Sequence, residues 1–299
     1  MTQPAQATAH AKPLDRYAVL GHPVAHSQSP FIHGEFARQT GQALSYERID
    51  CPPDGFEASV RAFIASGDEG RGLGPARGCN ITVPFKFQVL PLAATVTPRA
   101  QLAQAANVLR FDADGWLADN SDGIGLRRDI ERGAGVALAG KRVLLIGAGG
   151  AAAGVLGPLL QARPAAVTVA NRTLSNARLL VDRHAAEAAA HGVALHASGL
   201  ADAGAAFDVV INSSASSLAG DAVPVAAKVL APGALAVDLM YGTAAAPFLT
   251  WAAEHGATGR DGLGMLVEQA AEAFALWRGV LPDTAPVLAA LRQRLAAKP

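Results

Sequence analysis

A glycine-rich loop near the middle of the chain has the composition of a phosphate-binding turn. The apolar run Val143–Ile146 ends in Gly147, and an alanine-rich helical pattern follows at once. In such a unit Gly147 permits the tight turn, Gly149 leaves the backbone open to a pyrophosphate, and Ala152 lets the helix pack closely on the sheet. The N–H groups that open the helix then face the phosphates. The alternative is an ordinary tight turn, but the order of strand, glycines and helix favours dinucleotide binding.

The residues after the next predicted strand indicate which dinucleotide binds. Strand 166–170 is followed by Asn171, Arg172 and Thr173, where the adenosine ribose is recognised. An acidic residue there would favour a free 2′-hydroxyl, whereas a guanidinium suits a 2′-phosphate. Arg172 could also be a solvated loop arginine. NADP is favoured over NAD.

Three polar clusters in the first half follow predicted strands, at the edge where open α/β sheets bind ligands. They are 27–30, 80–86 and 119–123. Each has a structural alternative: Ser29 before Pro30 is typical of a helix N-cap, Lys86 of an exposed surface lysine, and Asp122 of another N-cap. A structural role of this kind does not explain Ser27, because one hydroxyl, that of Ser29, is enough to cap the helix.

A lysine and a carboxylate in these clusters could transfer a proton beside a hydride donor. Reduction of a ketone requires a hydride and a proton for the developing alkoxide. An ammonium group stabilises that oxyanion and supplies the proton, and the neutral amine is the base in the reverse direction. This chemistry needs no metal, and the eight histidines show no ligand spacing.

The elements that must position these residues are predicted as alternating strands and helices. In the first half we expect strands at 16–21, 44–49 and 78–83, a hairpin over 107–118 with its turn at 112–115, and helices from Ser29 and over 56–64. In the second half we expect strands at 142–146, 166–170, 194–197, 208–211 and 234–238. Alternating strands and helices imply a parallel sheet covered on both faces.

The last long helix is predicted from an apolar stripe between Leu263 and Trp277. It follows Asp261–Gly264, which we interpret as a flexible connector. Spacing alone leaves open whether this helix packs on the first or the second half of the chain.

Composition sets the broad class. A chain of 299 residues with 51% hydrophobic and 17% charged residues predicts two globular domains. A net charge of zero suggests neither nucleic acid nor an anionic membrane as a partner, and no apolar run predicts a transmembrane helix. Two distant cysteines, Cys51 and Cys79, indicate a reduced, cytoplasmic protein. Residues 1–14 are expected to form a flexible tail rather than a signal peptide.

Taken together, these motifs resemble the shikimate dehydrogenase family over nearly the whole chain. The matching segments are 17–21, 27–30, 80–86, Asn107, 119–123, 147–152, 171–173, 238–241 and 261–270. The resemblance implies a two-domain α/β fold: a substrate domain of residues 15–122 plus 264–299, and a doubly wound parallel-sheet (Rossmann) NADP domain of residues 123–263. The C-terminal helix then returns to the substrate domain.

The resemblance also implies reversible NADPH-dependent reduction of 3-dehydroshikimate to shikimate, in chorismate and aromatic amino-acid biosynthesis, by a monomer or homodimer. Lys86 and Asp122 would be the catalytic pair. The implied substrate-binding residues are Ser27, Ser29, Thr82, Asn107, Asp122, Tyr241 and Gln269. The implied NADP-binding residues are Gly147, Ala148, Gly149, Gly150, Ala151, Asn171, Arg172, Thr173, Ser214, Gly262 and Met265.

Some positions depart from the family pattern. Asn176 stands where many relatives have a second arginine, and Arg178 follows two residues later. Segment 212–216 replaces the usual Asn-Ala-Thr, the glycine expected just after it is missing until position 220, and Val108 replaces a threonine. The 2′-phosphate site is therefore expected to be weaker or built differently.

Three alternative functions remain. An NAD-dependent quinate/shikimate dehydrogenase is disfavoured by Arg172. A non-catalytic NADP-binding regulatory protein would have no use for both Lys86 and Asp122. Glutamyl-tRNA reductase has a similar second domain, but it would need a nucleophilic cysteine and a basic surface, which this sequence lacks.

Overall fold

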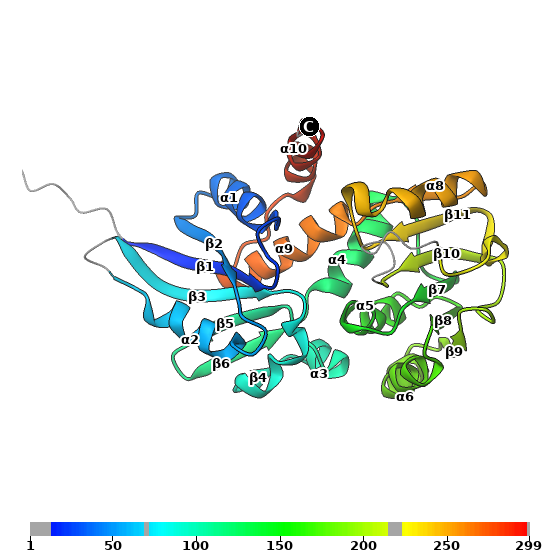
Figure 1. Ribbon diagram of the computed structural model, residues 1–299, viewed down its shortest axis with the longest axis horizontal. Helices are drawn as coiled ribbons and strands as arrows, with labels where there is room; N and C mark the ends of the chain where they lie inside the picture. The colour runs from blue at the N-terminus through cyan, green and yellow to red at the C-terminus, as the bar shows by residue number, and fades with distance from the viewer. Residues whose placement is uncertain (1–12, 69–71, 215–222, 298–299) are drawn as a thin grey trace, which may run out of the picture.

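The computed structural model describes residues 13–68, 72–214 and 223–297, and it places two six-stranded sheets at opposite ends of the molecule (Figure 1). Most of the expected N-terminal tail, residues 1–12, lies outside the described residues. The first sheet contains β1 (Leu14–Gly21), β2 (Leu44–Asp50), β3 (Leu73–Ile81), β4 (Thr95–Val96), β5 (Val108–Asp112) and β6 (Gly115–Asp119). Helices α1 (Ser29–Thr40), α2 (Phe56–Ala65), α3 (Pro98–Ala103) and α4 (Asp122–Arg128) accompany it.

The first sheet has the order β2-β1-β3-β5-β6-β4 and is mixed. Strands β1, β2 and β3 are parallel, whereas β5 is antiparallel to both β3 and β6. The expected hairpin is present, with Ala113 and Asp114 between its strands. This hairpin makes the sheet mixed, because so short a turn joins only antiparallel strands. The expected parallel pairing holds for β1, β2 and β3. The third strand ends at Ile81, before the predicted limit of residue 83.

The second sheet has the order β12-β11-β10-β7-β8-β9, and every pairing in it is parallel. Its strands are β7 (Arg142–Ile146), β8 (Ala166–Asn171), β9 (Ala194–Gly199), β10 (Phe207–Asn212), β11 (Leu230–Asp238) and β12 (Thr258–Arg260). Its helices include α5 (Gly150–Gln161), α6 (Leu174–Ala190) and α8 (Ala246–Glu254). This is the doubly wound order, with its switch point between β7 and β10, where such sheets bind dinucleotides. The predicted fold class is confirmed.

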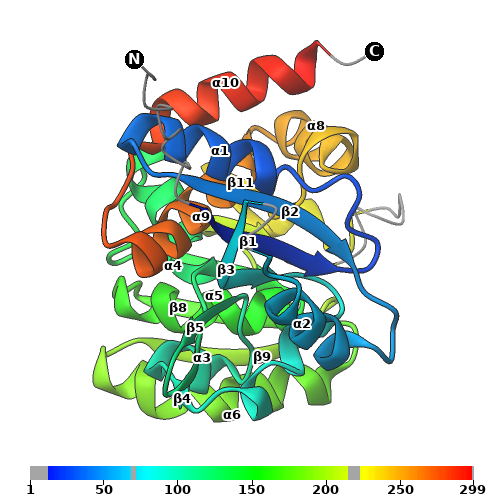
Figure 2. The same cartoon turned by 90° about the vertical axis from the view of Figure 1, so that its left-hand side faces the viewer.

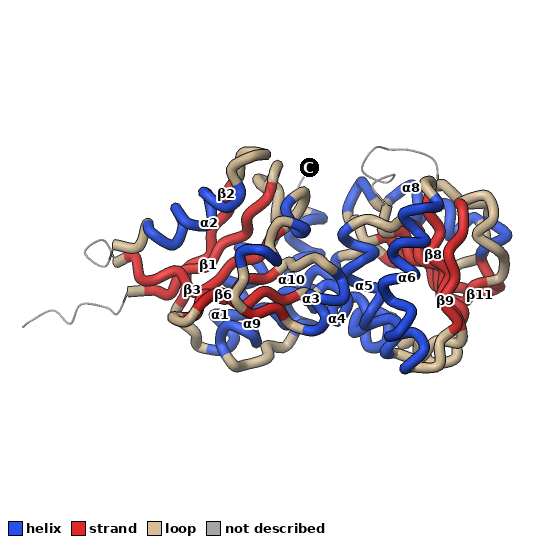
Figure 3. The backbone as a smooth tube through the Cα atoms, turned by 90° about the horizontal axis from the view of Figure 1, so that it is seen from below, coloured by secondary structure: helices blue, strands red, loops and turns tan. Residues whose placement is uncertain are grey.

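Helix α4 lies between the two halves (Figure 3), and its glycines permit close packing there. A Cβ on Gly123 would lie 2.5 Å from Pro158 of α5, and one on Gly125 would lie 2.7 Å from Gln269 of α9 (Leu263–Arg278). A Cβ on Gly264 would lie 1.7 Å from Oδ1 of Asp129. The interpretation of 261–264 as a flexible connector was therefore wrong: its glycines permit close packing.

Helix α9 packs on α1 and on strands of the first sheet. Val267 and Phe274 share a buried cluster with Ile32 and Phe36 of α1, and Trp277 Nε1 donates a hydrogen bond to the Leu109 carbonyl (3.0 Å). A further helix, α10 (Thr284–Ala296), was not predicted and lies beside α1 (Figure 2). These contacts support the domain division that we propose, with 15–122 and 264–299 on one side and 123–263 on the other. No helix among the described residues is long and apolar enough to cross a membrane.

One buried histidine predicts a pH dependence of stability. His33 is 1% exposed and stacks on Tyr46 at 4.4 Å between ring centroids, and burial lowers its pKa to about 3. The unfolded chain binds this proton near pH 6.5, so the stabilisation is complete above that pH and is lost between 6.5 and 3. We expect the unfolding free energy to fall by about 1.4 kcal/mol per pH unit there.

Urea unfolding of the variant His33→Phe across this pH range tests the expectation. As the pH is lowered, the unfolding free energy of His33→Phe should fall less steeply than that of the unsubstituted chain. His255→Gln, at an exposed histidine, should leave this pH dependence unchanged. A slope unaltered by His33→Phe would mean that His33 is not held neutral in the fold.

Candidate active site

The polar clusters of the first half meet at one edge of the first sheet. Strands β1, β3 and β6 end there at Gly21, Ile81 and Asp119. Strand β5 runs in the opposite direction, so Asn107, which precedes it, lies at the same edge, and Val108 pairs with Asp119. The sheet order therefore brings together residues that are far apart in the sequence.

Lys86 and Asp122 form an ion pair between Lys86 Nζ and Asp122 Oδ2. Their side chains are 17% and 6% exposed, so Lys86 is not an ordinary surface lysine. The alternative interpretation of Asp122 as an N-cap was wrong as well, because Ser121 is the N-cap and Asp122 is the first residue of α4. An ammonium that is held by a buried carboxylate but still accessible can donate a proton to a ligand oxygen.

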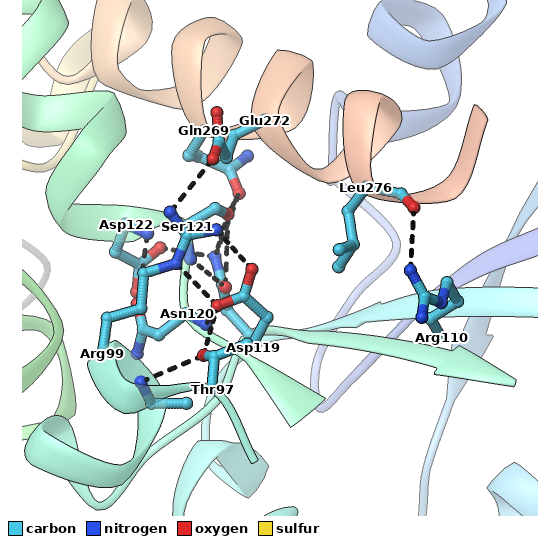
Figure 4. A network of polar contacts seen from close by, with 12 residues as sticks. Thr97, Arg99, Arg110, Asp119, Asn120, Ser121, Asp122, Gln269, Glu272 and Leu276 are labelled. Atoms are coloured by element: carbon cyan, nitrogen blue, oxygen red, sulfur yellow. Dashed lines mark hydrogen bonds and ion pairs between the residues drawn. The ribbon is translucent and has the colours of Figure 1, made fainter. Parts of the chain in front are cut away.

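Asn107 holds the other oxygen of this carboxylate. Its Nδ2 donates to Asp122 Oδ1 (2.8 Å), Ser121 Oγ (3.0 Å) and Gln269 Oε1 (3.1 Å). Its Oδ1 accepts from the Ser121 N–H (2.8 Å). Gln269 comes from α9, as Figure 4 shows. Three predicted site residues from separate segments, Asn107, Asp122 and Gln269, are thus brought into contact.

The turn before α1 positions the two predicted serines differently from expectation. Gln28, not Ser29, is the N-cap, and no side chain caps this helix. Instead Ser27 Oγ accepts a hydrogen bond from the Ser29 N–H (3.3 Å) and donates to Ser29 Oγ (3.1 Å). The prediction of a capping role for Ser29 was therefore wrong, and Ser27 is the serine that supports the turn. Arg48 fixes the same turn by donating to the Ser27 carbonyl (2.9 and 2.6 Å).

Thr82 and Tyr241 lie near the same region without joining this hydrogen-bond network within the described residues. The Thr82 N–H donates to the Leu20 carbonyl (2.9 Å), which places its side chain directly after β3. Tyr241 is half-buried and packs against the cluster that contains Ile32 of α1. Burial raises the pKa of its phenol, so Tyr241 is a neutral hydrogen-bonding group at neutral pH.

The glycine loop fits a dinucleotide. Gly147 has a φ of +108°, which favours glycine, and a Cβ on it would lie 2.7 Å from Ser213 Oγ. Apart from Gly149 and its two chain neighbours, no atom of the described residues lies within 4 Å of the position that a Cβ on Gly149 would occupy. A pyrophosphate can therefore approach the backbone there. The loop continues from Ala148 into α5, which begins with Gly150 and Ala151. The first N–H groups of this helix have no acceptor within the helix.

Asp122 and the residue after Lys86 lie next to the helix that follows this loop. A Cβ on Gly154 of α5 would be 3.2 Å from Asp122 Oδ2. Phe87, which follows Lys86, is 3.3 Å from the Cβ position of Gly150. The Lys86–Asp122 pair therefore borders the predicted cofactor site.

The predicted 2′-phosphate residues lie at the end of β8. Asn171 Nδ2 donates to the Thr173 carbonyl (2.9 Å) and shapes the turn into α6. Arg172 and Thr173 are exposed, and Arg172 forms no ion pair with any described residue. Asn176, which replaces an arginine of the family pattern, lines a hollow together with Ala148 and Phe87. The guanidinium of Arg172 is thus available to a ligand.

The remaining cofactor candidates lie around the switch point and the start of α9. Ser214 Oγ donates to Asn212 Oδ1 (2.7 Å) just after β10. The Gly262 N–H donates to the Met240 carbonyl (2.8 Å), and Met265 packs into the core of the second domain. Residues 215–222, with the departures at positions 215, 216 and 220, lie outside the described residues.

Sequence reasoning missed the charged residues behind the site. Arg48 holds the Ser27 turn, and Arg99 pairs with the buried Asp119. Arg48 lies within β2 and Arg99 within α3, and a single arginine on a strand or helix has no distinguishing local pattern. Only Asp119, within the predicted 119–123 cluster, gave a signal. Among the described residues no group of His, Cys, Asp or Glu could hold a metal ion.

A doubly wound domain with an open glycine loop, beside a lysine–carboxylate pair from a second domain, defines a dinucleotide-dependent oxidoreductase. Three family models match the chain: the shikimate dehydrogenase substrate binding domain over 19–109, shikimate / quinate 5-dehydrogenase over 130–224, and the shikimate 5′-dehydrogenase C-terminal domain over 262–292. The chain belongs to the shikimate dehydrogenase family.

Individual relatives agree with this membership. The chain is 65% identical over 284 residues to a shikimate dehydrogenase (NADP(+)) of Methylibium petroleiphilum, with 95% of this chain and 96% of the relative covered. An Ael1 enzyme from Pseudomonas putida has a similar structure (TM-score 0.81, 47% identity, 93% and 98% covered). So does a shikimate 5-dehydrogenase from Thermus thermophilus solved with NADP(H) and shikimate (TM-score 0.75, 29% identity, 94% and 99% covered).

Proposed function

We propose that this protein catalyses the reversible NADPH-dependent reduction of 3-dehydroshikimate to shikimate, in chorismate and aromatic amino-acid biosynthesis. The observation that carries the proposal is the Lys86–Asp122 ion pair beside the helix of the glycine loop. Relatives named shikimate dehydrogenase (NADP(+)) at 50–65% identity support the same reaction and cofactor.

Lys86 is the proton donor in the reductive direction. As the carbonyl π bond breaks, its electron pair moves to oxygen, and the new O–H bond forms with a proton from Lys86 Nζ. The ammonium also stabilises the developing negative charge on that oxygen. Asp122 keeps Nζ oriented, and in the oxidative direction the neutral amine accepts the hydroxyl proton. When bound, the reduced nicotinamide supplies the hydride that the carbonyl carbon receives.

The other site residues bind and orient the two ligands. We propose that Ser27, Ser29 and Tyr241 bind the substrate carboxylate, and that Thr82, Asn107 and Gln269 bind its ring hydroxyls. We assign NADP to the loop residues Gly147–Ala151, to 171–173, and to Ser214, Gly262 and Met265. The first N–H groups of α5 suit the pyrophosphate, and Arg172 suits the 2′-phosphate.

Absorbance at the reduced-nicotinamide band tests the function directly. Purified protein is supplied with shikimate or quinate, each paired with NADP+ or NAD+. We expect shikimate with NADP+ to give the highest kcat/KM. A higher kcat/KM with quinate and NAD+ would favour the quinate alternative. Cofactor binding without turnover of either substrate would favour the regulatory protein.

Arg172 provides a prediction about cofactor choice. A charge-assisted contact to the 2′-phosphate contributes roughly 1.5–3 kcal/mol. We therefore expect Arg172→Ala to raise the KM for NADP+ by about tenfold or more and to leave the KM for NAD+ nearly unchanged. Arg163→Ala, at an exposed arginine after α5, serves as the control. Equal losses for both cofactors would show that Arg172 only supports the fold.

Ser27 and Ser29 provide a prediction about the carboxylate. Either serine-to-alanine change should raise the dissociation constant of shikimate, measured calorimetrically with NADP+ present. Ser27→Ala should also lower the unfolding free energy by about 1 kcal/mol, because its hydroxyl supports the turn. Ser59→Ala, which removes a similar local hydrogen bond on α2, should leave shikimate affinity unchanged. Normal affinity in Ser27→Ala would place the carboxylate elsewhere.

We also propose a cytoplasmic monomer or homodimer that has neither nucleic acid nor a membrane as a partner. The zero net charge supports the absence of nucleic acid or an anionic membrane as a partner. Cys51 and Cys79 are both free and buried, which fits a reducing compartment.

A further inference from the structure

A second cluster of charges anchors the loop that presents Asp122, and the proposed mechanism does not use it. Asp119 is 1% exposed. Its Oδ1 accepts hydrogen bonds from Thr97 Oγ1 (2.6 Å), Arg99 Nε (2.6 Å) and the Asn120 N–H (2.8 Å). Its Oδ2 accepts from Arg99 Nη2 (Figure 4). Burial alone would raise the pKa of Asp119, but the Arg99 guanidinium outweighs it and keeps the pKa below its ordinary value.

The same guanidinium reaches the helices that carry site residues. Arg99 Nη1 donates to Glu272 Oε1 on α9 (3.0 Å), and Glu272 Oε2 pairs with Arg128 Nη2 on α4 (2.9 Å). Glu272 lies three residues after Gln269, close to one helical turn. Arg128 ends the helix that Asp122 begins. One chain of charges therefore links the loop, α9 and α4.

We propose that Arg99 is a positioning residue of this site. Through Asp119 it fixes the loop that leads to Asp122. Through Glu272 it fixes the turn of α9 that presents Gln269. This inference rests on the proposed function and adds a residue to it that touches neither substrate nor cofactor.

The contacts require an arginine. The planar guanidinium spans both oxygens of Asp119 and still has Nη1 free for Glu272, whereas a lysine ammonium is a compact point charge without this fork. The side chains of Arg99, Asp119 and Glu272 are only 22%, 2% and 19% exposed. Water therefore cannot readily replace the contacts that a substitution of Arg99 would remove. Arg99→Lys thus keeps the charge and removes the geometry.

Kinetics of Arg99→Lys in the full chain test the proposal. A displacement of about 1 Å can cost on the order of 10²-fold in rate, so we expect kcat/KM for shikimate to fall by about tenfold to 10²-fold. The dissociation constant of NADP+ should not change, because the glycine loop belongs to the second sheet. Glu272→Gln should raise the KM for shikimate more than it lowers kcat. Arg127→Lys is the matched control, because Arg127 forms a part-buried ion pair with Glu131, four residues further along the chain, and not with Asp119 or Glu272.

A readout independent of turnover separates this inference from the proposed function. The side-chain amide resonances of Asn107 report on Asp122 and Gln269 together, and we expect them to shift in Arg99→Lys but not in Arg127→Lys. Unshifted resonances with normal kinetic constants, and only a lower melting temperature, would overturn the proposal. Shifted resonances in a protein whose unsubstituted form does not oxidise shikimate would contradict the proposed function and still support the positioning role.

Discussion

Replacing Lys86 with alanine is expected to lower kcat for shikimate oxidation by about 10²–10⁴-fold, the usual contribution of general acid–base catalysis. Lys86 Nζ is the proton-transferring atom of the proposed site, and Asp122 holds it in place. The affinity for NADP+ should survive, because the glycine loop and Arg172 belong to the second domain. The measurement is kcat at saturating shikimate and NADP+, with a separate titration of NADP+.

Lys141 offers a matched control for this variant. It also forms an ion pair, with Asp208, but that pair is exposed and lies far from the site at the start of the second sheet. Lys141→Ala should leave kcat unchanged. Near-normal turnover in Lys86→Ala would contradict the catalytic assignment and favour a protein that binds NADP without catalysis.

The second large effect is expected for Asp122→Asn. This change preserves the shape of the side chain but removes the charge that orients Lys86, and it places an amide donor or a weaker acceptor against the ammonium. Breaking one side of a buried pair is strongly unfavourable. We expect kcat to fall by at least about 10²-fold.

The KM for shikimate should rise in the same variant, because Asp122 Oδ1 also accepts from Asn107. Asp208→Asn in the exposed pair is the control, and neither kinetic constant should change in it. A normal kcat in Asp122→Asn would mean that Lys86 needs no carboxylate for its orientation.

Local sequence patterns were sufficient to predict the main strands and the glycine turn of the dinucleotide domain. The strand, glycine turn and helix around Gly147 are adjacent in sequence, so their signal does not depend on distant contacts. The predicted strands of the second half all occur, although β12 has only three residues and was missed. Such a short strand exists because it pairs with β11, which the sequence does not reveal.

The helix start at Ser29 shows where local reasoning fails. A side-chain cap needs an N-cap residue in an extended conformation, but Gln28 has φ −88° and ψ −3°. The turn is set by Arg48, which holds the Ser27 carbonyl from the neighbouring strand. The sequence alone therefore assigns a capping role to Ser29, although no side chain caps this helix.

The remaining contacts of the site join residues that are far apart in the sequence, so local patterns could not predict them. Arg99 and Glu272 are 173 residues apart, and no local pattern connects them. The sequence indicates flexibility at Gly264, whereas in the fold this glycine lets α9 approach Asp129. Lys86, Asn107 and Gln269 could be predicted as site residues from the family resemblance, but the hydrogen bonds that join Asn107 to Asp122 and to Gln269 follow only from the fold.

The central claim is that Lys86 and Asp122 act as one acid–base unit, and a double-variant cycle tests it most directly. The measurement is kcat for Lys86→Ala, Asp122→Asn and the double variant, at saturating shikimate and NADP+. Residues that act as a unit are not additive, so we predict that the double variant is little slower than the slower single variant. Losses that multiply in the double variant would show two independent contributions and contradict the account.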